Sequence, residues 1–347
     1  MAKPSVKLTL KDMAARLGVS TATVSNAFNR PDQLSRDLRE RILSECHASG
    51  YHGPNAAARS LRTGKTGIIG VFLSNYLAYS FRDPVAQQFL QGLAEVFEES
   101  DYSMLVVPSR DHVKQTHGYE SFVDGFVIYG PPQHGPLQYL IDMHKSIITV
   151  DFEIDGYPAV NIDNFEGARR CAQHAVADIE GPVTILGLRL LAANRICRIQ
   201  DNELFDADST ITVQRLRGFI DAADDAGVTI PNNQIFHIPD NTHELGYQAA
   251  TEALSRSPRP RLLLCMSDRI ALAAMQAARH LGLRVPEDLR VTGFDDIPEA
   301  TTHNPTLTTV HQQSIDKGRI AAEIYQGKRP ERNVMLPTEL IIRESCP

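Results

Sequence analysis

Two short amphipathic segments joined by a tight turn occupy residues 9–30, and they constrain the fold of this chain more than any other feature. Thr9 and Asp12 have the spacing of a capping box, which predicts the start of a helix. The apolar residues that then recur at the spacing of one helical face are Leu10, Met13, Ala14 and Leu17. Gly18 can adopt the left-handed conformation that ends such a helix.

A second helix is predicted to start after Ser20, its N-cap. Val24 and Phe28 are four residues apart, so they are expected to share its buried face. The opposite face carries short side chains, polar or ending in a methyl group: Thr21, Ala22, Thr23, Ser25 and Asn26. Such a helix fits a DNA major groove, with its N-terminus toward the base edges. An ordinary helical hairpin with a small polar face would show the same spacing.

The distribution of charge favours DNA binding. The chain of 347 residues has a net charge of -7, but residues 1–66 carry 11 Lys/Arg against 5 Asp/Glu, and the remainder carries 24 against 37. A basic head on an acidic body is expected when only one end of a protein meets phosphate.

The length and cysteine content indicate a multidomain protein of a reducing compartment. A chain of 347 residues is too long for one ordinary domain. Its five cysteines are scattered and show no C-x-x-C spacing, so neither a zinc site nor a disulfide framework is expected. The sequence shows no signal-peptide pattern at its start, and its apolar runs are too short to span a bilayer, so a cytoplasmic location is expected.

A third helix and a short helical segment follow. Ser35 is the predicted cap of the third helix, Gly50 its end, and its apolar stripe is Leu38, Ile42 and Leu43. Residues 55–62 are predicted to form a further helical segment, too short to be stable alone in water. Leu61 in this segment is a candidate wedge between DNA base pairs. Alternatively, Leu61 packs on the domain that follows.

Residues 9–66 resemble the DNA-binding head and hinge of the lactose repressor/galactose repressor (LacI/GalR) family. The matching signature is Thr-Leu-x-Asp-x-Ala-x-x-x-Gly-Val-Ser-x-x-Thr-Val-Ser, followed by Asn29, Gly-Tyr, Pro-Asn and Ala-x-x-Leu. The resemblance implies that two hinge helices of a dimer form on operator DNA and that Leu61 enters the minor groove. It also implies that positions 21, 22 and 26 read bases.

The DNA-contacting residues expected from the pattern and the resemblance lie in the head and the hinge. They are Thr9, Ser20, Thr21, Ala22, Thr23, Ser25, Asn26, Asn29, Ser35, Tyr51, Asn55, Ala58, Leu61 and Arg62.

From residue 67 the chain alternates between short apolar runs and amphipathic stretches. Ten strands are predicted, at Ile68–Leu73, Met104–Val107, Gly125–Tyr129, Ile147–Asp151, Ala159–Ile162, Val183–Leu188, Gln234–Ile238, Arg261–Met266, Leu289–Gly293 and Thr308–His311. Seven helices are predicted, at Pro84–Ser100, Gln138–His144, Asn164–Asp178, Thr212–Ala226, His243–Ser255, Arg269–Gly282 and Ile315–Gln326. This alternation predicts parallel sheets in two doubly wound lobes, with a ligand site between them at the carboxyl ends of the strands.

The body resembles the periplasmic-binding-protein-like core of the same family, and the matches extend to about residue 343. Among them are Arg-Leu-Arg-Gly-Phe from Arg215, Ser267-Asp268, and Gly293-Phe294-Asp295-Asp296. Effector-contacting positions of the family fall on Asp151, Arg215, Asp268 and Gln312. Such charged and amide groups suit a hydroxylated ligand, because each can hold two hydroxyl groups.

Three departures from the family pattern bear on the ligand. Asn241 stands where many sugar-binding members carry an aromatic residue, so Tyr76 and Phe81 are candidates for stacking instead. The segment 189–210 is longer than the family pattern, and the segment 107–123 is shorter. The missing aromatic residue and the longer segment favour a ligand other than a simple hexose.

The sequence shows no motif of a catalytic centre. Gly64-Lys65-Thr66 ends like a phosphate-binding loop, but Arg59 replaces the first glycine. There is no G-x-S-x-G or H-E-x-x-H, and the histidines lack metal-ligand spacing. We therefore expect no enzyme, metal or cofactor.

The predicted architecture is an all-α helix-turn-helix head at 1–54, a hinge helix and linker at 55–66, and an α/β two-lobe core with parallel doubly wound sheets at 67–347. The predicted function is that of a dimeric transcriptional regulator, most often a repressor in this family, controlled by a sugar or nucleoside. Control by a protein partner is the alternative. A sugar- or nucleoside-acting enzyme would leave the head unexplained, and a solute-binding protein would need an export signal.

Overall fold

The computed structural model of the protein describes residues 8–53, 64–100, 102–107, 118, 122–132, 137–200 and 210–347. The predicted hinge residues Asn55, Ala58, Leu61 and Arg62 lie outside the described residues, as does 201–209 of the long segment. The chain divides into two compact units, Met1–Ile68 with Gly118–Asp124, and Ile69–His117 with Gly125–Pro347.

The first unit is a small helical domain. Its helices are α1 (Leu10–Leu17), α2 (Thr21–Asn29) and α3 (Arg36–Ala48), with a 3-10 turn at Pro31–Gln33 between the last two. The predicted capping box is confirmed: Asp12 N donates to Thr9 Oγ1, and Thr9 N donates to the Asp12 carboxylate. Gly18 ends α1 with a φ of 66°, in the left-handed region that favours glycine.

Ser35 is the N-cap of α3 as predicted, although its side chain makes no capping hydrogen bond. On α2 the residue buried beside Val24 is Ala27, whereas Phe28 is half-buried and packs at the edge of the core. The fully buried centre of this unit is formed by Met13, Val24, Ala27, Ile42 and Cys46.

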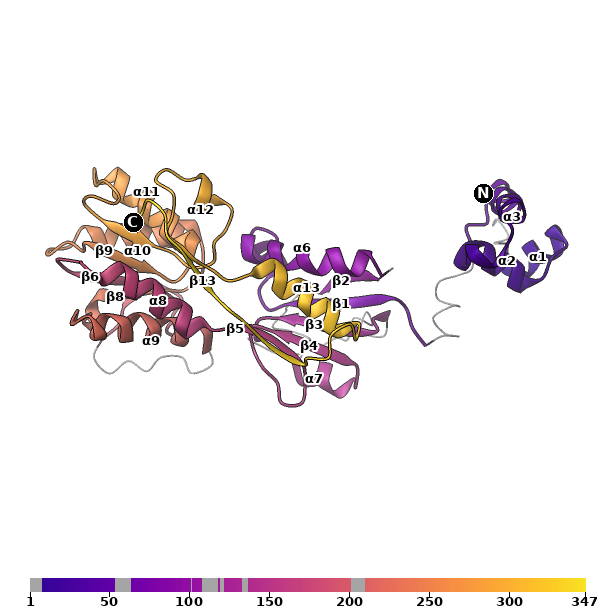
Figure 1. Ribbon diagram of the computed structural model, residues 1–347, viewed down its shortest axis with the longest axis horizontal. Helices are drawn as coiled ribbons and strands as arrows, with labels where there is room; N and C mark the ends of the chain where they lie inside the picture. The colour runs from indigo at the N-terminus through magenta and orange to yellow at the C-terminus, as the bar shows by residue number, and fades with distance from the viewer. Residues whose placement is uncertain are drawn as a thin grey trace, which may run out of the picture. The chain divides into compact units, whose positions relative to one another are not determined.

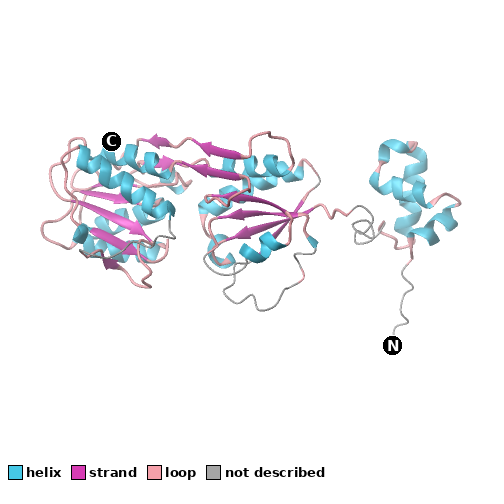
Figure 2. Ribbon diagram, turned by 90° about the horizontal axis from the view of Figure 1, so that it is seen from below, coloured by secondary structure: helices cyan, strands magenta, loops and turns pink. Residues whose placement is uncertain are grey.

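The second unit has two lobes, each built on a sheet with helices beside it (Figure 1 and Figure 2). The N-terminal lobe has the strand order β12 (Asn333–Leu336), β5 (Ala159–Ile162), β4 (Ser146–Val150), β3 (Gly125–Tyr129), β1 (Ile68–Leu73) and β2 (Ser103–Val107). The pairs from β12 through to β1 are parallel. The helices of this lobe are α5 (Leu77–Ser80), α6 (Pro84–Glu98), α7 (Leu137–Asp142) and α13 (Ser314–Tyr325).

The C-terminal lobe repeats this arrangement. Its strand order is β10 (Arg290–Thr292), β9 (Leu262–Cys265), β6 (Val183–Leu188), β8 (Ile235–Ile238) and β7 (Cys197–Arg198). Among the described strand pairs of this sheet, β7–β8 is antiparallel and the others are parallel. The helices are α8 (Asn164–Val176), α9 (Thr210–Asp225), α10 (His243–Leu254), α11 (Asp268–His280) and α12 (Glu299–Thr302), and a 3-10 turn at Asn232–Gln234 precedes β8.

The chain passes between the lobes three times, after β5, after β11 (Thr309–His311) and after β12. β11 pairs antiparallel with β13 (Glu339–Ile341) in a separate two-stranded sheet, and β13 crosses between the two lobes in Figure 1. A fold that crosses three times places residues from distant parts of the sequence at the junction of the lobes.

The predicted parallel, doubly wound sheets are confirmed. All ten predicted strands are present with bounds that differ by at most one residue, and all seven helices with bounds that differ by at most two. The strands β7, β12 and β13 were not predicted. β7 has two residues, and the two others are short, flank Pro337 and have mostly exposed or half-buried side chains, so they lack the apolar run of a core strand.

Candidate functional site: the surface of α2 and the junction of the lobes

The N-terminal end of α2 presents short side chains to solvent. Ser20 caps the helix by accepting a hydrogen bond of 3.0 Å from Thr23 N, and the Ser20 and Thr23 hydroxyl groups lie 2.8 Å apart. Thr21 and Ala22, in the first turn, are exposed. The predicted base-reading positions 21 and 22 are thus accessible at the end of the helix where amide groups point outward.

The next turn of α2 is partly engaged with its neighbours. Asn26 is half-buried, and its Nδ2 donates to Gln33 Oε1 at 3.0 Å. Asn29 Nδ2 donates to the Ser25 carbonyl oxygen at 2.9 Å. The amide of Asn26 must therefore leave or share Gln33 if it pairs with a base.

The remaining described head positions differ in exposure. Thr9 and Ser35 are exposed at the starts of α1 and α3, and Thr9 also serves its own cap. Tyr51 is only 7% exposed, and its ring lies edge-on to Phe28 with centroids 6.0 Å apart. Its hydroxyl group has no hydrogen-bond partner among the described residues, and burial raises its pKa. The predicted contact of Tyr51 with DNA would require its hydroxyl group to reach the surface.

Three of the predicted effector-contacting residues meet two further residues at the junction of the lobes. We call Asp151, Arg215, Asp295, Gln312 and Lys317 the interlobe cluster. Asp151 follows β4 in the N-terminal lobe, and Lys317 lies in the first turns of α13. Lys317 Nζ donates to both oxygens of Asp151, at 2.7 and 2.9 Å, and to Gln312 Oε1 at 2.7 Å.

The cluster continues into the C-terminal lobe. Gln312 Nε2 donates to Asp295 Oδ1 at 2.6 Å, and Arg215 Nη1 lies 3.5 Å from the same oxygen. Arg215 also donates to Asn164 Oδ1 at 2.9 Å. A continuous series of polar contacts therefore runs from the end of β4 to α8 and α9.

Burial gives these charges unusual electrostatics. Desolvation lowers the pKa of Lys317 and of Arg215, although neighbouring carboxylates oppose the change. Desolvation raises the pKa of Asp295 well above its ordinary value, against the effect of Arg215. Arg215 also packs its guanidinium over the ring of Phe294, 3.6 Å from the centroid. Groups with such shifted pKa values gather at functional sites more often than elsewhere.

Asp268, predicted to contact the effector, lies beside this cluster but points into the protein. Its side chain is buried, and its oxygens accept hydrogen bonds from the Thr309 hydroxyl group and from Ile297 N. Burial raises its pKa to about 7. Asp268 begins α11, so its two oxygens link this helix to β11 through Thr309 and to the loop after β10 through Ile297.

The candidate stacking residues behave as surface groups. Tyr76 is 66% exposed and Phe81 is 54% exposed, on either side of α5. Both rings are therefore largely open to solvent. Asn241 is buried and accepts a hydrogen bond of 2.6 Å from Ser267.

Two arginines of the C-terminal lobe, which the sequence analysis did not select, contact the N-terminal lobe directly. Arg189 Nη1 donates to Asn75 Oδ1 at 3.1 Å, and its Nη2 donates to Asp240 Oδ1 at 3.0 Å. Arg269 donates to the Arg82 carbonyl oxygen and lies 4.0 Å from Asp83. These contacts surround the same junction of the lobes.

Backbone strain is concentrated at this junction. Non-glycine residues with positive φ include Asp151 (63°), Arg189 (51°), Asp295 (133°) and Gln313 (53°). Such conformations are costly and persist where the surrounding structure imposes them, often at binding sites. Asp295, Lys317 and Arg189 were missed as single residues. Of these three residues, only Asp295 could have been selected from the sequence, because it lies in the stretch Gly293-Phe294-Asp295-Asp296 at the end of a strand.

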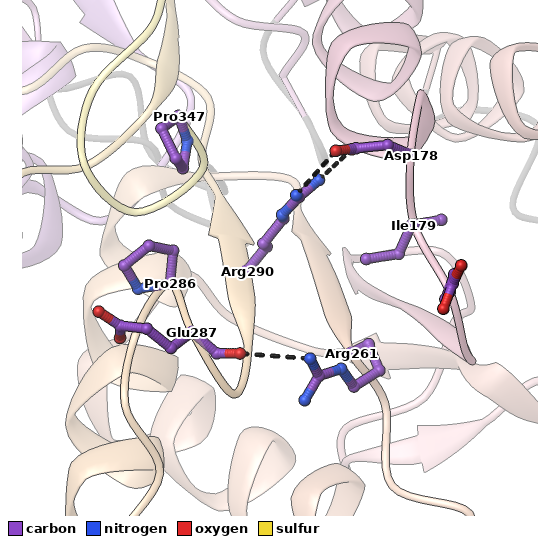
Figure 3. Close-up of a pocket in the computed structure, with 8 residues that line it drawn as sticks. Asp178, Ile179, Arg261, Pro286, Glu287, Arg290 and Pro347 are labelled. Atoms are coloured by element: carbon purple, nitrogen blue, oxygen red, sulfur yellow. Dashed lines mark hydrogen bonds and ion pairs between the residues drawn. The ribbon is translucent and has the colours of Figure 1, made fainter.

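A separate surface pocket of about 360 Å³ lies at the amino ends of the strands of the C-terminal sheet, away from the junction of the lobes (Figure 3). Arg290 there pairs with both oxygens of Asp178, and Arg261 donates to the Glu287 carbonyl oxygen. Both guanidinium groups are already used by the protein. None of the predicted site residues lines this pocket.

Within residues that the structure describes, no group of three or more His, Cys, Asp or Glu side chains is placed to hold a metal ion. No helix in the described ranges is long and apolar enough to cross a membrane.

Comparison with known proteins agrees with both units. Residues 9–55 match the family model of bacterial regulatory proteins of the lacI family, and residues 194–346 match a periplasmic binding protein-like domain. The HTH-type transcriptional regulator Rv3575c of Mycobacterium tuberculosis is 37% identical, over 97% of this chain and 96% of its own length. The HTH-type transcriptional repressor PurR of Haemophilus influenzae is 28% identical, over 97% of this chain and 98% of its own.

Among solved structures, a complex of the transcriptional regulator CelR with cellobiose has a TM-score of 0.68 at 25% identity. The match covers 97% of this chain and 99% of CelR. The helix-turn-helix head, the two-lobed core and these full-length similarities lead to one assignment. The chain belongs to the LacI/GalR family and is a DNA-binding transcriptional regulator.

Proposed function

We propose that this regulator binds an operator as a homodimer and represses transcription, and that a small hydroxylated metabolite bound between the lobes controls its affinity for DNA. The observation that carries the proposal is the interlobe cluster, which joins the two lobes through Asp151, Lys317, Gln312, Asp295 and Arg215. A ligand that replaced part of these contacts would change how the lobes are held together.

The position of the cluster supports a ligand site. Asp151, Asp240 and Asp295 each follow a strand that runs parallel to a neighbour, at its carboxyl end. In open α/β sheets, ligands bind outside these ends. Carboxylate, amide and guanidinium groups held in fixed positions suit a ligand with several hydroxyl groups.

The relatives support the two halves of the proposal separately. PurR, a repressor by name, supports repression. The cellobiose complex of CelR supports a sugar-like ligand in this fold. A sugar or a nucleoside is the ligand class we propose, and Arg215, Gln312 and Asp151 are its proposed contacts.

The exposed N-terminal end of α2 supports operator reading. Short side chains at positions 21 and 22 permit close approach to base edges, and the surrounding head carries a positive charge. The expected partner of each head is one half-site, because a dimer of helix-turn-helix heads reads two half-sites about one helical turn apart.

A salt titration tests DNA binding. Operator affinity measured by fluorescence anisotropy is expected to fall about 10³- to 10⁵-fold between roughly 50 and 200 mM salt, if 6–10 phosphates are neutralised. An affinity that is flat over this range would contradict binding through the basic head.

A thermal-shift screen tests control by a metabolite. A ligand that binds only the folded protein raises the melting temperature by mass action. Sugars and nucleosides are expected to stabilise the core and to change operator affinity. Intact operator binding without a shift from any of them would favour a protein partner as the controlling signal.

A further inference from the structure

The ammonium group of Lys317 is buried at the junction of the lobes, and each of its three N–H groups has a hydrogen-bond acceptor. An ammonium group has three donors, and here they bond Asp151 Oδ1, Asp151 Oδ2 and Gln312 Oε1. The side chain is buried, and the adjacent Asp151 carboxylate stabilises its positive charge. Lys317 thus fixes two residues that are proposed to contact the effector.

The other cations at the junction are paired in the same way. Four cations there each lie within 4.0 Å of a carboxylate. The pairs are Lys317 with Asp151 at 2.7 Å, Arg189 with Asp240 at 3.0 Å, Arg215 with Asp295 at 3.5 Å and Arg269 with Asp83 at 4.0 Å. Each of these four cations therefore already has a carboxylate beside it.

The pairing of these cations with carboxylates disfavours a negatively charged ligand. A phosphate monoester carries about -1.5 to -2 charges near pH 7 and needs unpaired cations to offset its desolvation. Here it would meet guanidinium and ammonium groups already shared with carboxylates, and those carboxylates would repel it. An uncharged polyhydroxylated ligand can exchange hydrogen bonds with the same groups without adding charge.

We propose that Lys317 is a positioning residue of the effector site: it holds Asp151 and Gln312 in place, cancels the charge of Asp151, and thereby makes the site select an uncharged ligand over its phosphorylated form. The inference rests on the proposed effector site and adds the charge class of the ligand. Lys317 acts through Asp151 and Gln312, since all of its donors are already occupied by these residues.

Three substitutions change the charge of the junction in a defined order. Asp151→Asn leaves Lys317 unpaired and adds one positive charge. Lys317→Met leaves Asp151 unpaired and adds one negative charge. The double variant Asp151→Asn/Lys317→Met restores the balance, and Lys328→Met is a matched control because Lys328 is an exposed lysine beyond the end of α13.

The test measures the full-length protein by thermal shift and calorimetry against matched probes: glucose and glucose 6-phosphate, ribose and ribose 5-phosphate, adenosine and adenosine 5′-monophosphate. The wild type is expected to bind the uncharged member of a pair more tightly, by about tenfold or more. Asp151→Asn should shift this preference at least about tenfold toward the phosphorylated member. Lys328→Met should keep the preference of the wild type, and the double variant, which restores the net charge, should shift the preference less than Asp151→Asn does.

The outcomes separate this inference from the proposed function. Tighter binding of a phosphorylated probe by the wild type, or an equal preference in Asp151→Asn and the double variant, would overturn the inference alone. Operator binding without any probe bound by any variant would instead overturn control by these metabolites. If Lys317→Met does not fold, the wild type, Asp151→Asn and the double variant still give the required order.

Discussion

His311 Nδ1 on β11 lies 2.9 Å from Asp296 Oδ2, in the loop after β10, where the chain crosses between the lobes. The other oxygen of Asp296 accepts a hydrogen bond of 2.7 Å from Arg343 Nη2, and Glu339 is the cross-strand partner of His311. The crossing strands are therefore held by a group of charges that includes one histidine.

This pair predicts a loss of stability as the pH rises through neutrality. The hydrogen bond to Asp296 raises the pKa of His311 above its ordinary value of 6.5. Folding therefore favours the protonated form, and the added stability is complete below pH 6.5 and is lost as the pH rises through the folded-state pKa. Asp296 stays ionised in this range, because hydrogen bonds from His311 and Arg343 lower its pKa despite burial.

Urea denaturation at about pH 6 and about pH 8.5 measures the effect. His311→Gln should remove most of the pH dependence of the core transition that arises from this pair, whereas His243→Gln, at an exposed position on α10, should keep it. An equal pH dependence in wild type and His311→Gln would show that the pair does not contribute.

Asn26→Ala tests how the head reads DNA. An amide can pair bidentately with adenine in the major groove, so the loss should cost about 1–3 kcal/mol per contact and relax the preference at one base pair. The measurement is binding to a set of operators that differ at that position, with exposed Ser44→Ala on α3 as the control. Equal weakening on every sequence would indicate a phosphate contact instead. Because Asn26 bonds Gln33, Gln33→Ala should retain the base preference.

Gly92→Ala tests the packing of the N-terminal lobe. A Cβ atom at Gly92 of α6 would lie 1.9 Å from the carbonyl oxygen of Ile315 on α13, and backbone cannot yield as a side chain can. The expected loss of unfolding free energy is about 1–3 kcal/mol or more. Glu98→Ala, at the exposed end of the same helix, should change it by less than about 0.5 kcal/mol. A loss as small in Gly92→Ala would mean that the two helices can separate without cost.

Local signals in the sequence were sufficient for most elements of the fold. Thr9 and Asp12 are three residues apart, and their capping box depends only on that spacing. The core strands are continuous apolar runs, which predict strands without knowledge of their partners. By contrast, β12 has no such apolar run, because it lies next to Pro337 and has exposed side chains. Its parallel pairing with β5 brings Asn333 into contact with Ala159, which is 174 positions away in the sequence.

The candidate site was less predictable because its charges are paired across the fold. Lys317 follows Asp316 and precedes Gly318 on an amphipathic helix, where a lysine ordinarily faces solvent. Its partner Asp151 is 166 residues earlier, so only the tertiary structure shows that this lysine is buried. The same limit applies to Asp268 at a strand end. Only the tertiary structure shows that its carboxylate accepts hydrogen bonds from Thr309 and from Ile297 inside the protein.

Arg215 provides the test of coupling between the lobes and the head. Its guanidinium donates to Asn164 Oδ1 and to the Met266 carbonyl oxygen at 2.7 Å, so it joins α9 to α8 and to the end of β9. Arg215→Ala is expected to abolish the response of operator affinity to a stabilising sugar or nucleoside while leaving operator binding in place. The reason is that the head and the ligand site are distinct and are linked only by a coupling free energy.

Removal of Arg215 also leaves Asp295 buried without its cation, which can cost about 3–5 kcal/mol. The double variant Arg215→Met/Asp295→Asn removes both charges and is expected to fold, and to lose the response in the same way. Arg217→Ala is the matched control, because Arg217 is exposed on the same helix. Operator affinity is measured by anisotropy with and without ligand. A response of the wild-type size in both Arg215 variants would show that Arg215 is not part of the effector site.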